Sequence, residues 1–160
     1  MLQINDVVPL ETPYVDENGL SGTMEDFLGG WVVLYFYPRD NTPGCTVEAE
    51  GFRDMQKEFE KEGVCIVGVS KDTCKSHQKF IEKKKLTFTL LADEDHKLME
   101  AFGVWGERTF MGRTYMGTSR STFLVDPKGK IVHVWEQVKP VRHAQEVLEQ
   151  VRVAQKEYGH

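Results

Sequence analysis

One stretch of the chain constrains its fold more than any other: the seven residues Trp31–Tyr37, WVVLYFY. Every one of them is aromatic or aliphatic, and polar and apolar side chains do not alternate along the stretch. A strand with one face in water alternates, whereas a strand covered on both faces is a continuous apolar run. The stretch therefore predicts a central strand with helices packed on both sides of its sheet.

The flanking sequence alternates between strand-like and helix-like patterns. Strands are predicted over residues 12–15, 20–23, 31–37, 64–70, 87–92, 121–126 and 130–136. Helices are predicted over residues 24–28, 45–62, 73–85, 93–102 and 142–158. Residues 103–117 are predicted to be irregular, with a short strand at Phe110. This order predicts a parallel core with an antiparallel edge. We expect an α/β, thioredoxin-like fold, a central mixed sheet flanked by helices on both faces.

Length and charge narrow the class of protein. The 160 residues, 1–160, are expected to form a single domain. The formal net charge of −5 argues against nucleic-acid binding, which usually needs a basic face. The longest apolar run is far shorter than the roughly 20 residues that span a bilayer, and the N-terminus lacks the pattern of a signal peptide. We expect a cytoplasmic protein without a membrane segment.

The three cysteines, Cys45, Cys65 and Cys74, do not form a familiar motif. An odd, low number is not typical of a secreted disulfide framework. No two of them form the C-x-x-C of a thioredoxin-type oxidoreductase. The histidines lack the spacing of zinc ligands, so no metal site is predicted.

Cys45 stands where the first long helix is predicted to begin, directly after the central strand. A helix N-terminus presents free N–H groups and the positive end of the helix dipole, which stabilise a thiolate. The carboxyl end of a strand in an open α/β sheet is also where ligands bind. By position alone Cys45 is either a reactive thiol or a small buried hydrophobic residue.

The residues around Cys45 resemble a known family. The segment 35–54, YFYPRDNTPGCTVEAEGFRD, contains Pro38-x-x-x-Thr42-x-x-Cys45, which is similar to the active-site motif of the peroxiredoxins. Together with segments 88–117 and 121–131, it resembles the bacterioferritin comigratory protein (BCP/PrxQ) subfamily over roughly residues 20 to 150. The resemblance implies a thiol-dependent peroxidase that reduces hydrogen peroxide and organic hydroperoxides without a metal or organic cofactor.

The resemblance also implies roles for individual residues. Cys45 matches the peroxidatic cysteine, which becomes a sulfenic acid. Thr42 matches the threonine whose hydroxyl contacts the peroxide, and Pro38 the proline that shields the thiolate. Arg120 matches a distant arginine at the thiolate, where a guanidinium stabilises negative charge. Glu48 matches an acidic position that either pairs with a base in the pocket or complements the helix dipole.

The chain departs from the subfamily where the sulfenic acid would be resolved. Glu50 and Ile81 stand at the two positions where relatives carry a resolving cysteine. Cys65 is predicted to be an inert core residue. Cys74 would reach Cys45 only if local structure unfolds. We therefore expect a one-cysteine mechanism with an external thiol, which the resemblance implies to be thioredoxin, with glutathione or glutaredoxin as alternatives.

Two further questions stay open at this level. A peroxide sensor could use the same oxidisable Cys45 without turnover, although sensors often carry a poised second cysteine. Trp105, Phe110 and Tyr115 either line the pocket, pack internally or form an association surface. The subfamily implies a monomer or a weak homodimer.

Overall fold

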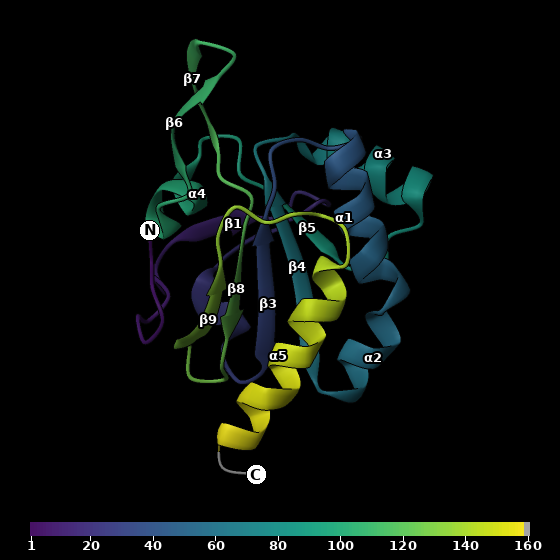
Figure 1. Ribbon diagram of the computed structural model, residues 1–160, viewed down its shortest axis with the longest axis vertical. Coiled ribbons are helices and arrows are strands. Elements are labelled where there is room, and N and C mark those ends of the chain that lie inside the picture. Colours follow the sequence, from purple (N-terminus) through teal and green to yellow (C-terminus); the bar gives the residue numbers. More distant parts are fainter. Residues whose placement is uncertain (159–160) are drawn as a thin grey trace.

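A five-stranded mixed sheet forms the centre of the protein, whose computed structural model describes residues 1–158 (Figure 1). In spatial order its strands are β5 (Thr89–Ala92), β4 (Val64–Ser70), β3 (Trp31–Phe36), β8 (Ser121–Val125) and β9 (Ile131–Trp135). β3, β4 and β5 are parallel, and β8 and β9 run antiparallel to their neighbours. Every residue of β3 is buried, as its continuous apolar sequence predicts.

The two faces of the sheet are covered by different helices (Figure 1). One face packs against α1 (Pro43–Asp54), α2 (Gln56–Lys61), α3 (Cys74–Lys84) and α5 (His143–Glu157). The other packs against α4 (Lys97–Phe102) and the 3₁₀ helix η1 (Met24–Phe27), beside the hairpin of β1 (Pro13–Val15) and β2 (Ser21–Thr23). Successive side chains of β3 point to opposite faces of the sheet and pack into the hydrophobic core on each face. Tyr35 stacks on Phe52 of α1, whereas Phe36 contacts Phe102 of α4. The thioredoxin-like architecture is therefore as predicted.

The helix predicted over residues 45–62 is wrong in one respect, because it is interrupted. It consists of α1 and α2, separated at Met55. The Met55 amide bonds to the carbonyl of Phe52, three residues back, which tightens the chain and lets it change direction. Both Phe52 and Phe59 are buried on the two sides of this break. Two short helices that pack against the same core show the same apolar spacing as one long helix, so the spacing could not predict the break.

The prediction of irregular structure over residues 103–117 is also wrong, although the short strand predicted at Phe110 falls within a longer one. This segment forms the hairpin of β6 (Trp105–Phe110) and β7 (Arg113–Thr118), which projects from the body of the molecule (Figure 1). Met111 and Gly112 connect the strands, both with positive φ, as in the tight turns that suit hairpins. Phe110 and Tyr115 are exposed on it, whereas Trp105 stacks on His96 at 3.7 Å between ring centroids.

Cys65 is exposed, so the prediction that it is a buried core residue is wrong. It is the second residue of β4, and the pairing of β4 with β5 begins only at Val67, opposite Thr89. The start of β4 therefore extends past its neighbour. The apolar sequence of a strand does not show where the next strand begins, and that decides whether Cys65 is covered.

The longest helix, α5, closes the fold with one apolar face against the sheet. Its buried side chains recur at helical spacing: Ala144, Val147, Leu148, Val151 and Ala154. The opposite side is charged and exposed. Within residues 1–158, no helix combines the length and apolar character needed to cross a membrane.

Candidate active site

Cys45 lies in the first turn of α1, at the carboxyl end of the central strand. Thr42 is the N-cap, with an extended backbone, and Pro43 is the first helical residue, where its missing N–H costs nothing. The amide of Thr46 makes the first helical hydrogen bond, to the carbonyl of Thr42 at 2.9 Å. The amides of Gly44 and Cys45 precede it, so the positive end of the helix lies at Cys45, a residue that is only 1% exposed.

Arg120 reaches this thiol from the connection between β7 and β8. Its Nη2 donates to Cys45 Sγ at 3.3 Å, and its Nη1 donates to Glu48 Oε1 at 2.7 Å. The backbone of Arg120 is held by the amide of Val138, which donates to its carbonyl. The distant arginine that the resemblance implied thus lies beside Cys45.

Glu48 is fully buried one turn after Cys45 and pairs with Arg120, which selects the first of the two roles considered for it. Burial raises the pKa of Glu48 to about 7, although the charge and hydrogen bond of Arg120 oppose the shift. Among the described residues, neither Glu48 Oε2 nor the buried hydroxyl of Tyr35 has a hydrogen-bond partner. Because both residues are buried, the floor of the site has a low effective dielectric constant, which strengthens the interactions of Arg120.

The positive charge at the site belongs to Arg120. Burial opposes that charge, but the acidic groups of Glu48 and Cys45 outweigh it and hold the pKa of Arg120 above its ordinary value. The other buried base nearby is His143, which is hydrogen-bonded to Thr122 at 2.8 Å. Burial, aided by the charge of Arg120, lowers the pKa of His143 to about 4, so it is neutral near pH 7.

Gly44 has a role that the motif alone did not show. A Cβ atom at this position would lie 3.2 Å from Arg120 Nη2 and 3.5 Å from Cγ of Pro140. A side chain here would press on the guanidinium that contacts Cys45. Glycine therefore lets Arg120 pack against the first turn of α1.

The other motif residues, Pro38 and Thr42, lie on the loop between β3 and α1. Pro38 is half-buried and lies two residues beyond the end of β3. The Thr42 hydroxyl donates to the carbonyl of Arg39 at 3.0 Å. That oxygen still has lone pairs that can accept a hydrogen bond from a peroxide.

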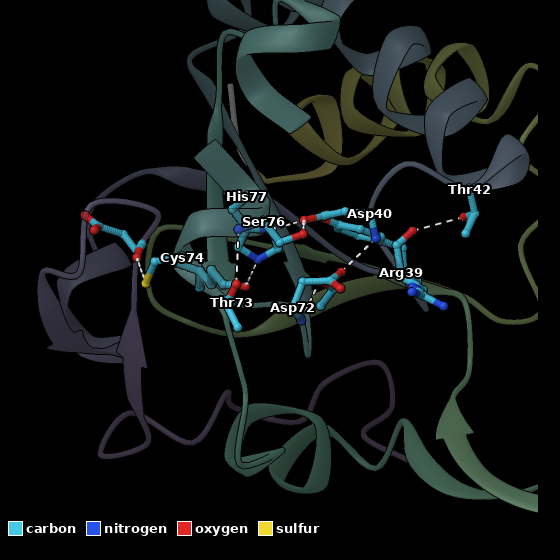
Figure 2. A network of polar contacts seen from close by, with 12 residues as sticks. Arg39, Asp40, Thr42, Asp72, Thr73, Cys74, Ser76 and His77 are labelled. Carbon is cyan, nitrogen blue, oxygen red and sulfur yellow. Dashed lines mark hydrogen bonds and ion pairs between the residues drawn. The ribbon is translucent and has the colours of Figure 1, made fainter. Parts of the chain in front are cut away.

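Cys74 is the first residue of α3 and is bonded elsewhere. Its Sγ donates to the carbonyl of Asp16 at 3.2 Å, in the segment that joins β1 and β2. Cys74 and Thr42 lie at opposite ends of the polar network in Figure 2. All three cysteines are free thiols. The structure therefore does not bring Cys74 to the candidate site.

Known proteins resemble this chain in sequence and in fold. The AhpC/TSA family matches residues 5–134. Peroxiredoxin Bcp of Escherichia coli K12 is 46% identical over 147 residues, which cover 92% of this chain and 94% of that protein. A PrxQ cysteine variant of Xylella fastidiosa has a TM-score of 0.91 at 38% identity, covering 96% of this chain and 98% of that one.

A third comparison concerns a protein studied with ligands. The bacterioferritin comigratory protein of Xanthomonas campestris has a TM-score of 0.86 at 39% identity, and the match covers 93% of this chain and 99% of that one. It was solved as trapped intermediate and ligand complexes in work on its alkyl peroxide reduction. Similarity of sequence and fold over nearly the whole length shows that this chain belongs to the AhpC/TSA family and, within it, to the Bcp/PrxQ peroxiredoxins, which are thiol-dependent peroxidases.

Proposed function

We propose that the chain reduces hydrogen peroxide and organic hydroperoxides through the Cys45 thiolate. The observation that carries this proposal is the contact of 3.3 Å between Arg120 Nη2 and Cys45 Sγ at the start of α1. A buried sulfur that accepts from a guanidinium and lies at a helix N-terminus is stabilised as the nucleophilic thiolate. The alkyl peroxide reduction described for the Xanthomonas campestris relative supports organic hydroperoxides as substrates.

The reaction begins with a displacement at oxygen. The Cys45 sulfur donates an electron pair to the terminal peroxide oxygen, an S–O bond forms and the O–O bond breaks. The cysteine is oxidised to a sulfenic acid, and the departing oxyanion takes a proton and leaves as water or an alcohol. Negative charge moves from sulfur to oxygen during this step. The two-pronged Arg120 guanidinium is placed to follow that charge, and Thr42 and Pro38 orient and shield the peroxide.

An external thiol completes the cycle. It attacks the Cys45 sulfenic acid, forming a mixed disulfide and releasing water, and a second thiol then releases Cys45. Glu50 and Ile81 cannot take this role, and the Cys74 thiol is bonded to the carbonyl of Asp16. We propose thioredoxin, or glutathione or glutaredoxin, as the source of the thiol.

A basic groove beside the site favours a reductant with negative charge. The loop before α1 and the exposed side of α3 line an open groove of about 480 Å³. Its lining includes the cationic residues Arg39, Lys75, Lys79 and Lys83. The two acids in the lining, Asp40 and Asp72, are engaged in hydrogen bonds. A positive groove on a chain of net charge −5 raises the local concentration of an anionic thiol.

Charge reversal tests the groove. Lys79→Glu should slow the reduction of oxidised Cys45 by glutathione about threefold to tenfold at low salt and much less at high salt, because the attraction is screened. Reduction by the uncharged dithiothreitol should change little. Lys57→Glu, on exposed α2, makes the same change of net charge and is the matched control. If the two substitutions slow reduction by glutathione equally, the groove does not attract the reductant.

Mass spectrometry combined with turnover tests the function itself. Peroxide-treated protein should carry a trappable sulfenic acid on Cys45, and a complete thioredoxin system should sustain many cycles. A Cys45–Cys74 disulfide would instead show that Cys74 resolves the sulfenic acid. Consumption of one peroxide per chain, with the thiol system present, would support the sensor alternative.

A further inference from the structure

A buried polar cluster joins the loop before α1 to the first turn of α3 (Figure 2). The Asp40 carboxylate is its centre. The hydroxyl of Tyr37 donates to Oδ1 at 2.5 Å, and the hydroxyl of Ser76 donates to Oδ2 at 2.8 Å. Nδ1 of His77 lies 2.7 Å from the same Oδ2. His77 is completely buried and Asp40 nearly so, and none of the reaction steps above uses either residue.

The hydrogen-bond partners determine where the protons lie. Nε2 of His77 is 2.8 Å from the carbonyl oxygen of Leu91, which can only accept, so Nε2 carries a proton. Asp40 already accepts from two hydroxyl groups, which favours its carboxylate form, so Nδ1 carries a proton as well. His77 is therefore an imidazolium, paired with the Asp40 carboxylate away from water.

A second contact fixes the backbone of the same loop. The amide of Asp40 donates to Oδ2 of Asp72 at 2.7 Å, and the hydroxyl of Ser70, at the end of β4, donates to the same oxygen at 2.6 Å. The acidic oxygens of Asp40 and Asp72 and a ring nitrogen of His77 lie within 4.8 Å of one another, close enough to suggest a metal site. Because both ring nitrogens of His77 already have partners, hydrogen bonds account for the cluster.

The anchored loop is the one that leads to the nucleophile. The carbonyl of Arg39, the residue before Asp40, accepts the hydroxyl of Thr42, so this hydroxyl is bonded to the chain directly next to the anchored residue. Asn41, between Asp40 and Thr42, has a φ of +60°, a conformation that needs support from its surroundings. Cys45 follows in the first turn of α1.

We propose that His77 is a positioning residue for the peroxidase reaction: as a buried imidazolium it holds the Asp40 carboxylate, and through it the turn that presents Thr42 and Cys45 to peroxide. This inference rests on the proposed function of Cys45. In this proposal α3 supports the loop that binds peroxide, although Ile81 stands where relatives carry a resolving cysteine.

The charge of His77 makes this support dependent on pH. The groups that face His77 are Tyr37 and Asp40 from the loop after β3, Asp72 from the loop after β4 and the Leu91 carbonyl from β5. Burial alone would lower the pKa of His77, but the hydrogen bond and charge of Asp40 outweigh it and raise the pKa above its ordinary value. The support is complete below that ordinary value and is lost as pH rises through the raised pKa.

The first experiment observes the proton directly in the resting enzyme. In ¹⁵N-labelled protein at pH 7, NMR should show both ring nitrogens of His77 protonated, with the signals assigned by their absence in His77→Gln. The state should persist above the pH at which an exposed histidine titrates. A singly protonated ring at pH 7 would overturn the proposal, whether or not Cys45 proves to be the nucleophile.

The second experiment measures kcat/KM for hydrogen peroxide against pH. His77→Gln and the isosteric Asp40→Asn should each lower it by about tenfold at pH 7, because a misplaced loop loses the productive geometry. The double variant should be no slower than either single variant. Wild-type activity should decline on the alkaline side as the imidazolium is lost, and His77→Gln should lack that decline.

Ser76→Ala is the matched control. It removes one hydrogen bond to Asp40 and leaves the ion pair with His77 intact, so its rate should fall less than about twofold. If Ser76→Ala slows the reaction as much as His77→Gln, then the loss of any hydrogen bond in the cluster is enough to slow it. That result would overturn the role proposed for the charge of His77. If His77→Gln does not fold, Asp40→Asn and the NMR measurement still decide the question.

Discussion

The first turns of α1 and α3 are alike in sequence and different in chemistry. Each helix follows a buried parallel strand, each has an extended threonine as its N-cap, and each has a cysteine in its first turn. Cys45 accepts a hydrogen bond from Arg120, whereas Cys74 donates one to the carbonyl of Asp16. An N–H donor at sulfur favours the thiolate, and a carbonyl acceptor favours the neutral thiol.

From this difference we predict that a helix N-terminus does not by itself make a cysteine reactive. The dipole is common to both helices, so it cannot separate the two thiols. What separates them is the partner that tertiary structure brings to each sulfur. For Cys45 that partner comes with a second contact, to Glu48, which aligns the guanidinium. Substitutions of the two thiols, of Arg120 and of Glu48 test this difference in turn.

The largest effect is expected from the thiols themselves. Cys45→Ser should lower peroxidase turnover by more than about 1,000-fold, because a hydroxyl is not ionised at neutral pH and cannot replace the thiolate. Cys74→Ser is the matched control and should change turnover by less than about twofold. Peroxide consumption with an excess of thiol measures both. Retained activity in Cys45→Ser would show that Cys45 is not the nucleophile.

A smaller effect is expected from the cation. Arg120→Ala should lower kcat/KM for peroxide by about 100-fold, since one preorganised charged donor is lost from a buried site. Stopped-flow measurement of Cys45 oxidation isolates this step. Arg113→Ala, on the exposed part of β7, is the control and should react like wild type. A normal rate in Arg120→Ala would show that the helix N-terminus alone makes Cys45 reactive. Arg120 would then not explain the difference between Cys45 and Cys74.

The smallest effect on rate is expected from the anchor. Glu48→Gln should slow the reaction only about threefold to tenfold, because Arg120 remains but loses its ionic partner. Its effect on stability depends on pH. The pKa of Glu48 is raised from 4.5 to about 7 in the folded protein, so the folded state holds a proton that the unfolded chain releases between these values.

The free energy of unfolding of the wild type should therefore fall as pH rises from about 4.5 to 7, by about 3 kcal/mol from this group. The glutamine variant has no carboxyl to titrate and should lack this decline. Urea denaturation at pH 5 and pH 8 measures the difference. A variant that declines as steeply as wild type would show that Glu48 is not the group responsible.

The fold was largely predictable because local patterns determine it. The apolar run at Trp31–Phe36 indicated a buried central strand, and helical spacing indicated α5. The errors fall where local pattern has no information. One apolar spacing fits a single helix or two helices joined at Met55, and Met111-Gly112 is not a familiar hairpin sequence.

Hydrophobic periodicity and capping act between near neighbours, so they predicted most of the elements and the placement of Cys45 at a helix start, but not the β6–β7 hairpin or the break at Met55. Tertiary structure alone decided which groups each polar side chain meets. Arg120 and Cys45 are 75 residues apart, Asp16 and Cys74 58, and Asp40 and His77 37. Arg120 was predictable only through family resemblance, and the other two pairs were not predicted. Such contacts depend on how strands align and loops close, which no local pattern encodes.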